Sequence, residues 1–203
     1  MRYLLRALVF LLSGGVVSLA AVDQESGLSG ADLKRIASGE CLVLERRPGE
    51  SATIDTKFVT TARLITGTRE RIWEVINDKE NAADFVEGVL ESKVLEKSGD
   101  RYTVEQHTHV GGPKGAYRYR LLYALTPKRR VDFTYVGGEL RDVIGSWWIF
   151  DGSKEANCLV IYSLHIDAGI FAPQSIVKAG MRKSMPKTMS AIAKEVARRD
   201  AGR

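Results

Sequence analysis

The middle of the chain alternates apolar and polar residues with a period of two. Successive side chains of a strand point to opposite faces, so this alternation predicts strands with one buried and one solvated face. Because polar turns separate these segments at short intervals, we expect an antiparallel meander. The predicted strands cover residues 89–96, 101–110, 116–126, 131–136, 144–150 and 158–167.

The segments on either side of this meander have helical spacing or short apolar runs. Ser29 and Thr68 are both suited to cap a helix that follows them. A much longer helix is expected after Pro173, and it is the only element long enough to cover the apolar face of the sheet. The predicted elements are a helix over 30–38, strands over 40–47 and 54–65, helices after Thr68 and over 81–85, and the long closing helix.

Methionines form a stripe on the closing helix. On a helical wheel the stripe extends from Val177 to Met189, and Gly180, Ser184 and Thr188 form an adjacent row of small residues. Methionine adapts to irregular partners, and Pro186 removes one backbone hydrogen bond and bends a helix. We therefore expect a cavity between helix and sheet, although methionines filling an ordinary core would give the same stripe.

Tyrosine dominates the face of the meander that should oppose this helix. Tyrosine presents a flat apolar body with one hydroxyl, which suits a large, mostly apolar ligand with a few polar atoms. In the preferred register Trp147 points inward and Trp148 outward. The predicted cavity residues are Phe85, Tyr102, Gln106, Tyr117, Tyr119, Tyr123, Phe133, Tyr135, Trp147, Tyr162, Val177, Met181, Met185 and Met189.

The order of elements, together with three segments, resembles the START-like (SRPBCC) superfamily. The segments are RERIWEVINDKENAADFVEGVLESKVLE, GSWWIF and IFAPQSIVKAGMRKSMPKTMSAIAKEVA, and the resemblance runs from about Ala31 to Val196. Trp73, Asp78 and Phe85 fit the pattern of the branch that holds polyketide cyclase/dehydrase-like and coenzyme Q-binding proteins. The resemblance implies an α+β helix-grip fold, a curved antiparallel sheet with two short helices and a long C-terminal helix over a cavity.

This resemblance also implies a function, which is the binding and transport or sequestration of a lipid, a sterol or hopanoid, or a quinone. One alternative is an enzyme of the cyclase/dehydrase type, for which Gln106, Thr108, Tyr119 and Asp167 are the acid–base candidates. Another is a module that binds a protein of the cell envelope. The chain has no nucleophile motif of the G-x-S-x-G type, P-loop or dinucleotide fingerprint, and no cofactor is expected.

The first 21 residues have the layout of a secretory signal peptide. Two arginines precede an apolar run that is too short to span a bilayer, and small residues follow it. We expect export, in bacteria to the periplasm, with an N-terminal extension over 22–50 and the ligand-binding domain over 51–200. Disulfides persist after export, so Cys41 and Cys158 can pair, with buried free thiols as the equal alternative.

The basic character of the chain is concentrated in its closing helix. The formal net charge is +5, or +3 without Arg2 and Arg6, whereas residues 174–199 alone carry +6. We expect Arg182, Lys183 and Lys187 to face solvent, where they can attract an anionic membrane surface. Export argues against nucleic acid as the partner. A solvated strand face explains Glu105, His107 and His109 without a metal.

Overall fold

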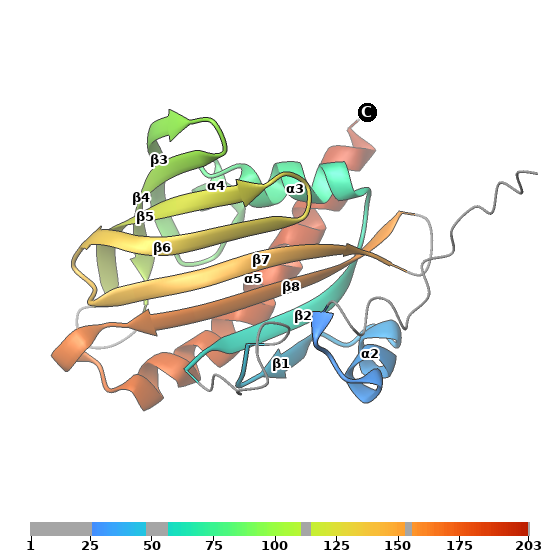
Figure 1. Ribbon diagram of the computed structural model, residues 1–203, viewed down its shortest axis with the longest axis horizontal. Helices are drawn as coiled ribbons and strands as arrows, with labels where there is room; N and C mark the ends of the chain where they lie inside the picture. Colours follow the sequence, from blue (N-terminus) through green and yellow to red (C-terminus); the bar gives the residue numbers. More distant parts are fainter. Residues whose placement is uncertain (1–25, 48–56, 111–114, 153–155, 203) are drawn as a thin grey trace, which may run out of the picture.

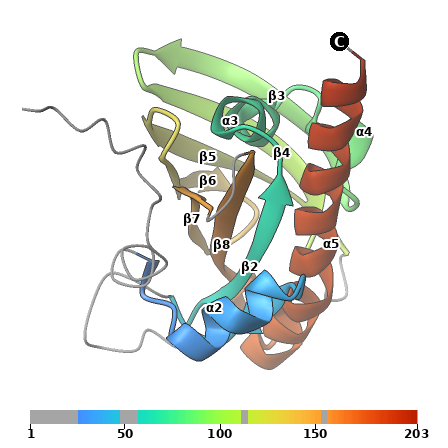
Figure 2. The same cartoon turned by 90° about the vertical axis from the view of Figure 1, so that its right-hand side faces the viewer.

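The computed structural model describes residues 26–47, 57–110, 115–152 and 156–202. Within these ranges, eight strands form one curved antiparallel sheet, and the long helix α5 lies across its open side (Figure 1 and Figure 2). The elements are α2 (Gly30–Ala37), β1 (Leu42–Leu44), β2 (Val59–Thr66), α3 (Arg69–Asn77), α4 (Ala82–Phe85), β3 (Val89–Ser98), β4 (Arg101–His109), β5 (Ala116–Thr126), β6 (Arg130–Gly138), β7 (Asp142–Asp151), β8 (Asn157–Asp167), the short helix η1 (Gly169–Phe171) and α5 (Gln174–Ala201).

The strand order confirms the predicted meander. The sheet runs β1-β2-β8-β7-β6-β5-β4-β3, so β3 to β8 are neighbours in the order of the chain. β2 pairs with β8 at the far side of the meander, and β1 extends that edge. Since α3 and α4 follow β2 directly, this crossover carries them to the opposite end of the sheet.

The predicted boundaries hold at most elements and fail near the N-terminus. The side chains of Ser29 and Thr68 both cap the helices that follow them, as predicted. The strand predicted over 40–47 is only three residues long, and β2 begins at Val59 rather than at residue 54. Residues 54–56 and the predicted signal peptide lie outside the described residues.

The main hydrophobic core lies between the inner face of the sheet and α5. α5 continues through Pro186 as one unbroken helix of 28 residues. Its predicted apolar stripe is buried against the sheet, which explains why unbranched and β-branched apolar residues recur at this spacing. The buried apolar residues of the stripe are Val177, Met181, Met185, Met189, Ile192 and Val196.

A second, smaller core covers part of the outer face of the sheet. Leu33 and Ile36 of α2 pack with Phe150, and Trp148 joins them from the edge of the cluster. Trp147 points inward and Trp148 outward, as the sequence predicts. The outer face is therefore not solvated along its whole length, because α2 shields this corner.

Candidate functional site

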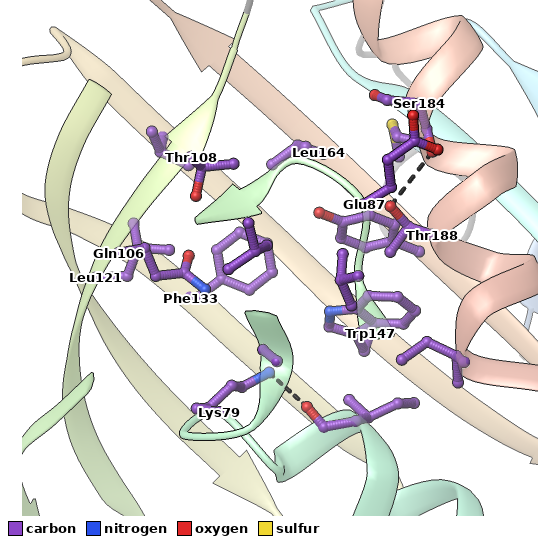
Figure 3. Close-up of a pocket in the computed structure, with 18 of the residues that line it drawn as sticks. Lys79, Glu87, Gln106, Thr108, Leu121, Phe133, Trp147, Leu164, Ser184 and Thr188 are labelled. Atoms are coloured by element: carbon purple, nitrogen blue, oxygen red, sulfur yellow. Dashed lines mark hydrogen bonds between the residues drawn. The ribbon is translucent and has the colours of Figure 1, made fainter. Parts of the chain in front are cut away.

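A cavity of about 150 Å³ lies between the sheet, α5 and the segment formed by α3 and α4. Its floor comes from the inner face of β4 to β8, and one side comes from Met181 and Met185 of α5. Figure 3 shows the labelled residues of these walls converging from the sheet and from α5 on the same space. The site is therefore built by elements from both halves of the chain.

Aromatic contacts fix the shape of the sheet wall. The rings of Trp147 and Tyr162 stack with their centroids 3.9 Å apart, and those of Tyr123 and Phe133 lie 5.4 Å apart. Gly145 leaves room for Phe133, since a Cβ at Gly145 would come within 2.3 Å of the ring. Such packed rings have few alternative rotamers, so this wall is rigid.

The hydroxyls on this wall are neutral hydrogen-bonding groups. Burial raises the pKa of Tyr119, Tyr123 and Tyr162 above the usual value for tyrosine. The Thr108 hydroxyl lies beside that of Tyr119 and opposes the shift of its pKa, but its oxygen forms no well-aligned hydrogen bond among the described residues. The wall can thus donate and accept hydrogen bonds without carrying charge.

The wall formed by α5 is softer. Met181 and Met185 line the cavity together with Ser184 and Thr188, which belong to the predicted row of small residues. The Thr188 hydroxyl donates a hydrogen bond to the carbonyl oxygen of Ser184, 3.3 Å away, as threonine hydroxyls do within helices. Methionine has three rotatable bonds, so this side of the cavity can change shape at low cost.

The structure brings most of the predicted cavity residues to the lining. Five of the predicted residues lie outside this lining, and they are Tyr102, Tyr117, Tyr135, Val177 and Met189. Tyr102 donates to the Asn77 side chain, and Tyr135 donates to the carbonyl of Gly138 at the end of β6. The predicted residues that do line it are Phe85, Gln106, Tyr119, Tyr123, Phe133, Trp147, Tyr162, Met181 and Met185.

Lys79 is a cavity residue that the sequence pattern did not reveal. It lies in the turn between α3 and α4 and is only 8% exposed. Its ammonium group donates to the carbonyl of Ile76 and stands 4.7 Å from the centre of the Tyr123 ring. Burial lowers the pKa of Lys79 to about 7, against the opposing effect of the neighbouring Asp78. The sequence could not reveal this, because a single buried lysine in a polar turn has the same neighbours along the chain as an exposed lysine would.

Ion pairs connect α5 to the segments beside the cavity. Lys187 contacts Glu87 of the α4–β3 connection, with 3.0 Å between nitrogen and oxygen, and Arg199 contacts Asp78 at 2.5 Å. Arg182 pairs with Glu45 beyond β1. Arg182, Lys183 and Lys187 are exposed, as predicted, but two of the three already face a carboxylate. No helix in the described ranges has the length and apolarity needed to cross a membrane.

The two cysteines are free thiols, which corrects the hypothesis of a disulfide. Cys41 precedes β1 and Cys158 lies in β8, and β2 runs between these strands. Two strand spacings amount to about 9–10 Å, which is longer than a disulfide reaches. Burial raises the pKa of both thiols, and that of Cys158 reaches about 11.

The remaining candidates from the sequence lie away from the centre of the cavity. Asp167 accepts a hydrogen bond from the backbone of Gly169 at the turn after β8. His107 and Glu105 face outward, and His109 lies at the rim of the cavity. In the part of the chain that the structure describes, no three His, Cys, Asp or Glu side chains form a metal-binding group.

Residues 65–193 match the family model described as polyketide cyclase/dehydrase and lipid transport. The chain belongs to this family. No curated protein sequence matches it. Membership in this family supports a hydrophobic small-molecule ligand, and the aromatic and methionine walls described above are suited to one.

Solved structures show the same architecture. The Zhui aromatase/cyclase from Streptomyces sp. R1128 superposes with a TM-score of 0.62 at 17% identity, over 70% of this chain and 94% of that one. A START superfamily protein from Mycobacterium smegmatis superposes with a TM-score of 0.62 at 11% identity, over 70% of this chain and 97% of that one. A STAR-related lipid transfer protein from Xanthomonas axonopodis superposes with a TM-score of 0.58 at 11% identity, over 69% of this chain and 85% of that one. The fold is the START-like helix-grip fold.

Proposed function

We propose that this family member is a non-catalytic carrier that transports or sequesters a lipid, a sterol or hopanoid, or a quinone. The observation that supports the proposal best is the composition of the cavity, in which a rigid aromatic wall faces a deformable methionine wall. Such a site suits a bulky apolar body more than a defined reacting group. The similarity to a STAR-related lipid transfer protein supports the same class of ligand.

The size of the cavity indicates that this is a closed, ligand-free shape. About 150 Å³ accommodates a molecule the size of benzene, whereas drug-sized ligands occupy about 300–1,000 Å³. A lipid therefore requires the cavity to widen. The Lys187–Glu87 pair between α5 and the α4–β3 connection is exposed, and such a pair costs less than about 1 kcal/mol to break. We place the opening between these two segments.

The proposal includes a location in the cell envelope. Its support is the sequence of residues 1–21, whose basic start, apolar run and small-residue end are typical of a signal peptide. Contact with an anionic membrane would bring the opening close to a source of lipid. Since Arg182 and Lys187 are paired with carboxylates, this attraction is weaker than the sequence suggests. A coenzyme Q-type ligand remains one of the proposed cargoes.

Extraction and blocking experiments test the proposal together. Native mass spectrometry of gently purified protein, followed by organic extraction, should show a bound apolar molecule. Met185→Trp fills the cavity and should abolish uptake of a fluorescent lipid, whereas Ala197→Trp on the exposed face of α5 should leave uptake unchanged. Equal uptake by both variants, or an empty protein that binds none of the three ligand classes, would overturn the carrier proposal.

One observation favours a second candidate, which is an enzyme of the cyclase/dehydrase type. Lys79 has a pKa of about 7 and faces the cavity, and a group with such a pKa is suited to acid–base catalysis near neutral pH. The similarity to the Zhui aromatase/cyclase points the same way. Conversion of an aromatic polyketide mimic that stops in Lys79→Met would establish this candidate in place of the carrier.

A further inference from the structure

Lys79 gives the cavity one polar end. Its nitrogen lies in the closed space between α3, α4 and β5, and the side chain is 8% exposed. An ammonium group has three N–H donors, and the hydrogen-bond acceptor that the described residues offer it is the carbonyl of Ile76. The Tyr123 ring, 4.7 Å away, stabilises the charge but accepts no conventional hydrogen bond. Buried donors of this kind are costly unless an acceptor reaches them.

Two further polar side chains continue from Lys79 along one side of the cavity. Figure 3 shows Gln106 and Thr108 of β4 beside the cavity, with Gln106 between Lys79 and Thr108. The buried Thr108 oxygen lacks a well-aligned partner among the described residues. On the opposite side stand Trp147 and the residues of α5. Lys79, Gln106 and Thr108 thus form a polar edge, whereas the facing side combines the apolar Trp147, Met181 and Met185 with the small polar side chains of Ser184 and Thr188.

We infer that the ligand is an amphiphile that carries an anionic oxygen, which binds the Lys79 ammonium group, while Gln106 and Thr108 hold the polar atoms next to it. This inference rests on the proposed function and narrows its ligand class from any hydrophobic molecule to a lipophilic acid. A hydrocarbon or a simple alcohol would offer the ammonium group no anionic hydrogen-bond acceptor. Carboxylates and phosphate monoesters share the required chemistry.

The surroundings of Lys79 allow it to take up a proton when such an anion binds. At pH 8 a group with a pKa of about 7 is mostly neutral, and an adjacent anion favours the charged form. Burial opposes the charge on Asp78, but hydrogen bonds from Arg199 and Asn81 and the positive charge of Arg199 together outweigh it and lower the pKa of that carboxyl. Burial raises the pKa of Tyr102 and of Tyr123, so both hydroxyls stay neutral. The titratable groups next to Lys79 are Asp78 in the same turn and Tyr123 of β5. Behind them, Arg199 of α5 pairs with Asp78, and Tyr102 of β4 stacks on Tyr123.

Binding of matched twelve-carbon probes tests the inference. Dodecanoate, dodecyl phosphate and 1-dodecanol are titrated by calorimetry at pH 8 into the wild-type protein, into Lys79→Met and into Lys183→Met, which removes an exposed lysine of α5. We expect one of the anions to bind about ten- to a hundredfold more tightly than the alcohol, and Lys79→Met to abolish this preference. The anion that binds more tightly identifies the source of the charge.

Proton uptake provides a readout that a merely structural lysine would not change. Titrations in buffers of different ionisation enthalpy should show about one proton bound per anion by the wild type and by Lys183→Met, and none by Lys79→Met. If Lys79→Met does not fold, Lys79→Gln serves in its place. Equal affinity of wild type for the anions and the alcohol would overturn the inference and leave the carrier proposal standing. Absence of binding by all three probes and of any extracted ligand would instead overturn the carrier proposal.

Discussion

Replacing Lys79 by methionine should stabilise the protein at neutral pH and flatten the dependence of its stability on pH. The two side chains have similar length and volume, so methionine would fill the same space without a charge. The folded protein lowers the pKa of Lys79 from 10.5 to about 7 because burial disfavours the ammonium form. The lowered pKa means that burying the charged lysine reduces the free energy of unfolding, and the substitution removes this penalty.

The sign and size of the effect follow from proton linkage. Between pH 7 and 10.5 the unfolded chain holds a proton on Lys79 that the folded chain lacks, so the free energy of unfolding rises with pH in this window. Below about pH 7 both states are protonated, and the full penalty remains. The difference between the two pKa values corresponds to at most about 5 kcal/mol. The lost bond to the Ile76 carbonyl and the lost contact with Tyr123 offset about 2 kcal/mol of this. We expect Lys79→Met to gain about 3 kcal/mol at pH 6–7.

Urea unfolding at pH 6, 7, 8 and 9, followed by far-ultraviolet circular dichroism, measures the effect. The advantage of Lys79→Met should be greatest at pH 6–7 and shrink steadily towards pH 9, whereas exposed Lys183→Met should track the wild type. Parallel curves for wild type and Lys79→Met over the whole range would refute the reasoning. So would a variant that is less stable at every pH, which would show that the lysine is a net stabilising group.

Three other substitutions or treatments test separate parts of the structure. Gly145→Ala places a Cβ 2.3 Å from the Phe133 ring and should cost about 3 kcal/mol or more in thermal unfolding; an unchanged melting temperature would contradict the close packing. Glu195→Gln should cost about 1 kcal/mol at pH 7, because hydrogen bonds from its arginine partners hold the pKa of Glu195 at about 2. This contribution is present above pH 4.5 and lost as the pH falls towards 2, so a difference from wild type that persists at pH 2 would be inconsistent with it. Cys41 and Cys158 should both be alkylated in the unreduced, denatured protein, whereas a mass two daltons lower would reveal a disulfide.

The spacing of apolar residues in the sequence was sufficient to predict the elements and their faces. Alternation in strands and the 3.6-residue spacing in α5 are local properties, so they survive into the fold whatever lies opposite. The inward placement of Trp147 and the burial of the methionine stripe follow directly from them. Strand length near the N-terminus was predicted less well, because β1 depends on pairing with β2 rather than on its own residues.

Only the tertiary structure decided which of these inward residues border empty space. Tyr102 and Tyr119 belong to faces of the same kind, yet the first stacks on Tyr123 and donates to Asn77 while the second lines the cavity. The difference depends on how α3 and α4 pack across the end of the sheet, which no local period encodes. The separation of Cys41 from Cys158 likewise depends on β2 lying between their strands.

The family, the fold class and the apolar nature of the site were thus present in the linear pattern, because burial of one face requires only the right spacing of apolar residues. The charged group inside the site, Lys79, could not be found from that pattern. Lys79 lies in a polar turn that would be solvated in isolation, and it becomes buried because α3, α4 and the tyrosines of the sheet close around it. Its pKa is lowered by that enclosure, which is a property of three-dimensional packing and has no counterpart along the chain.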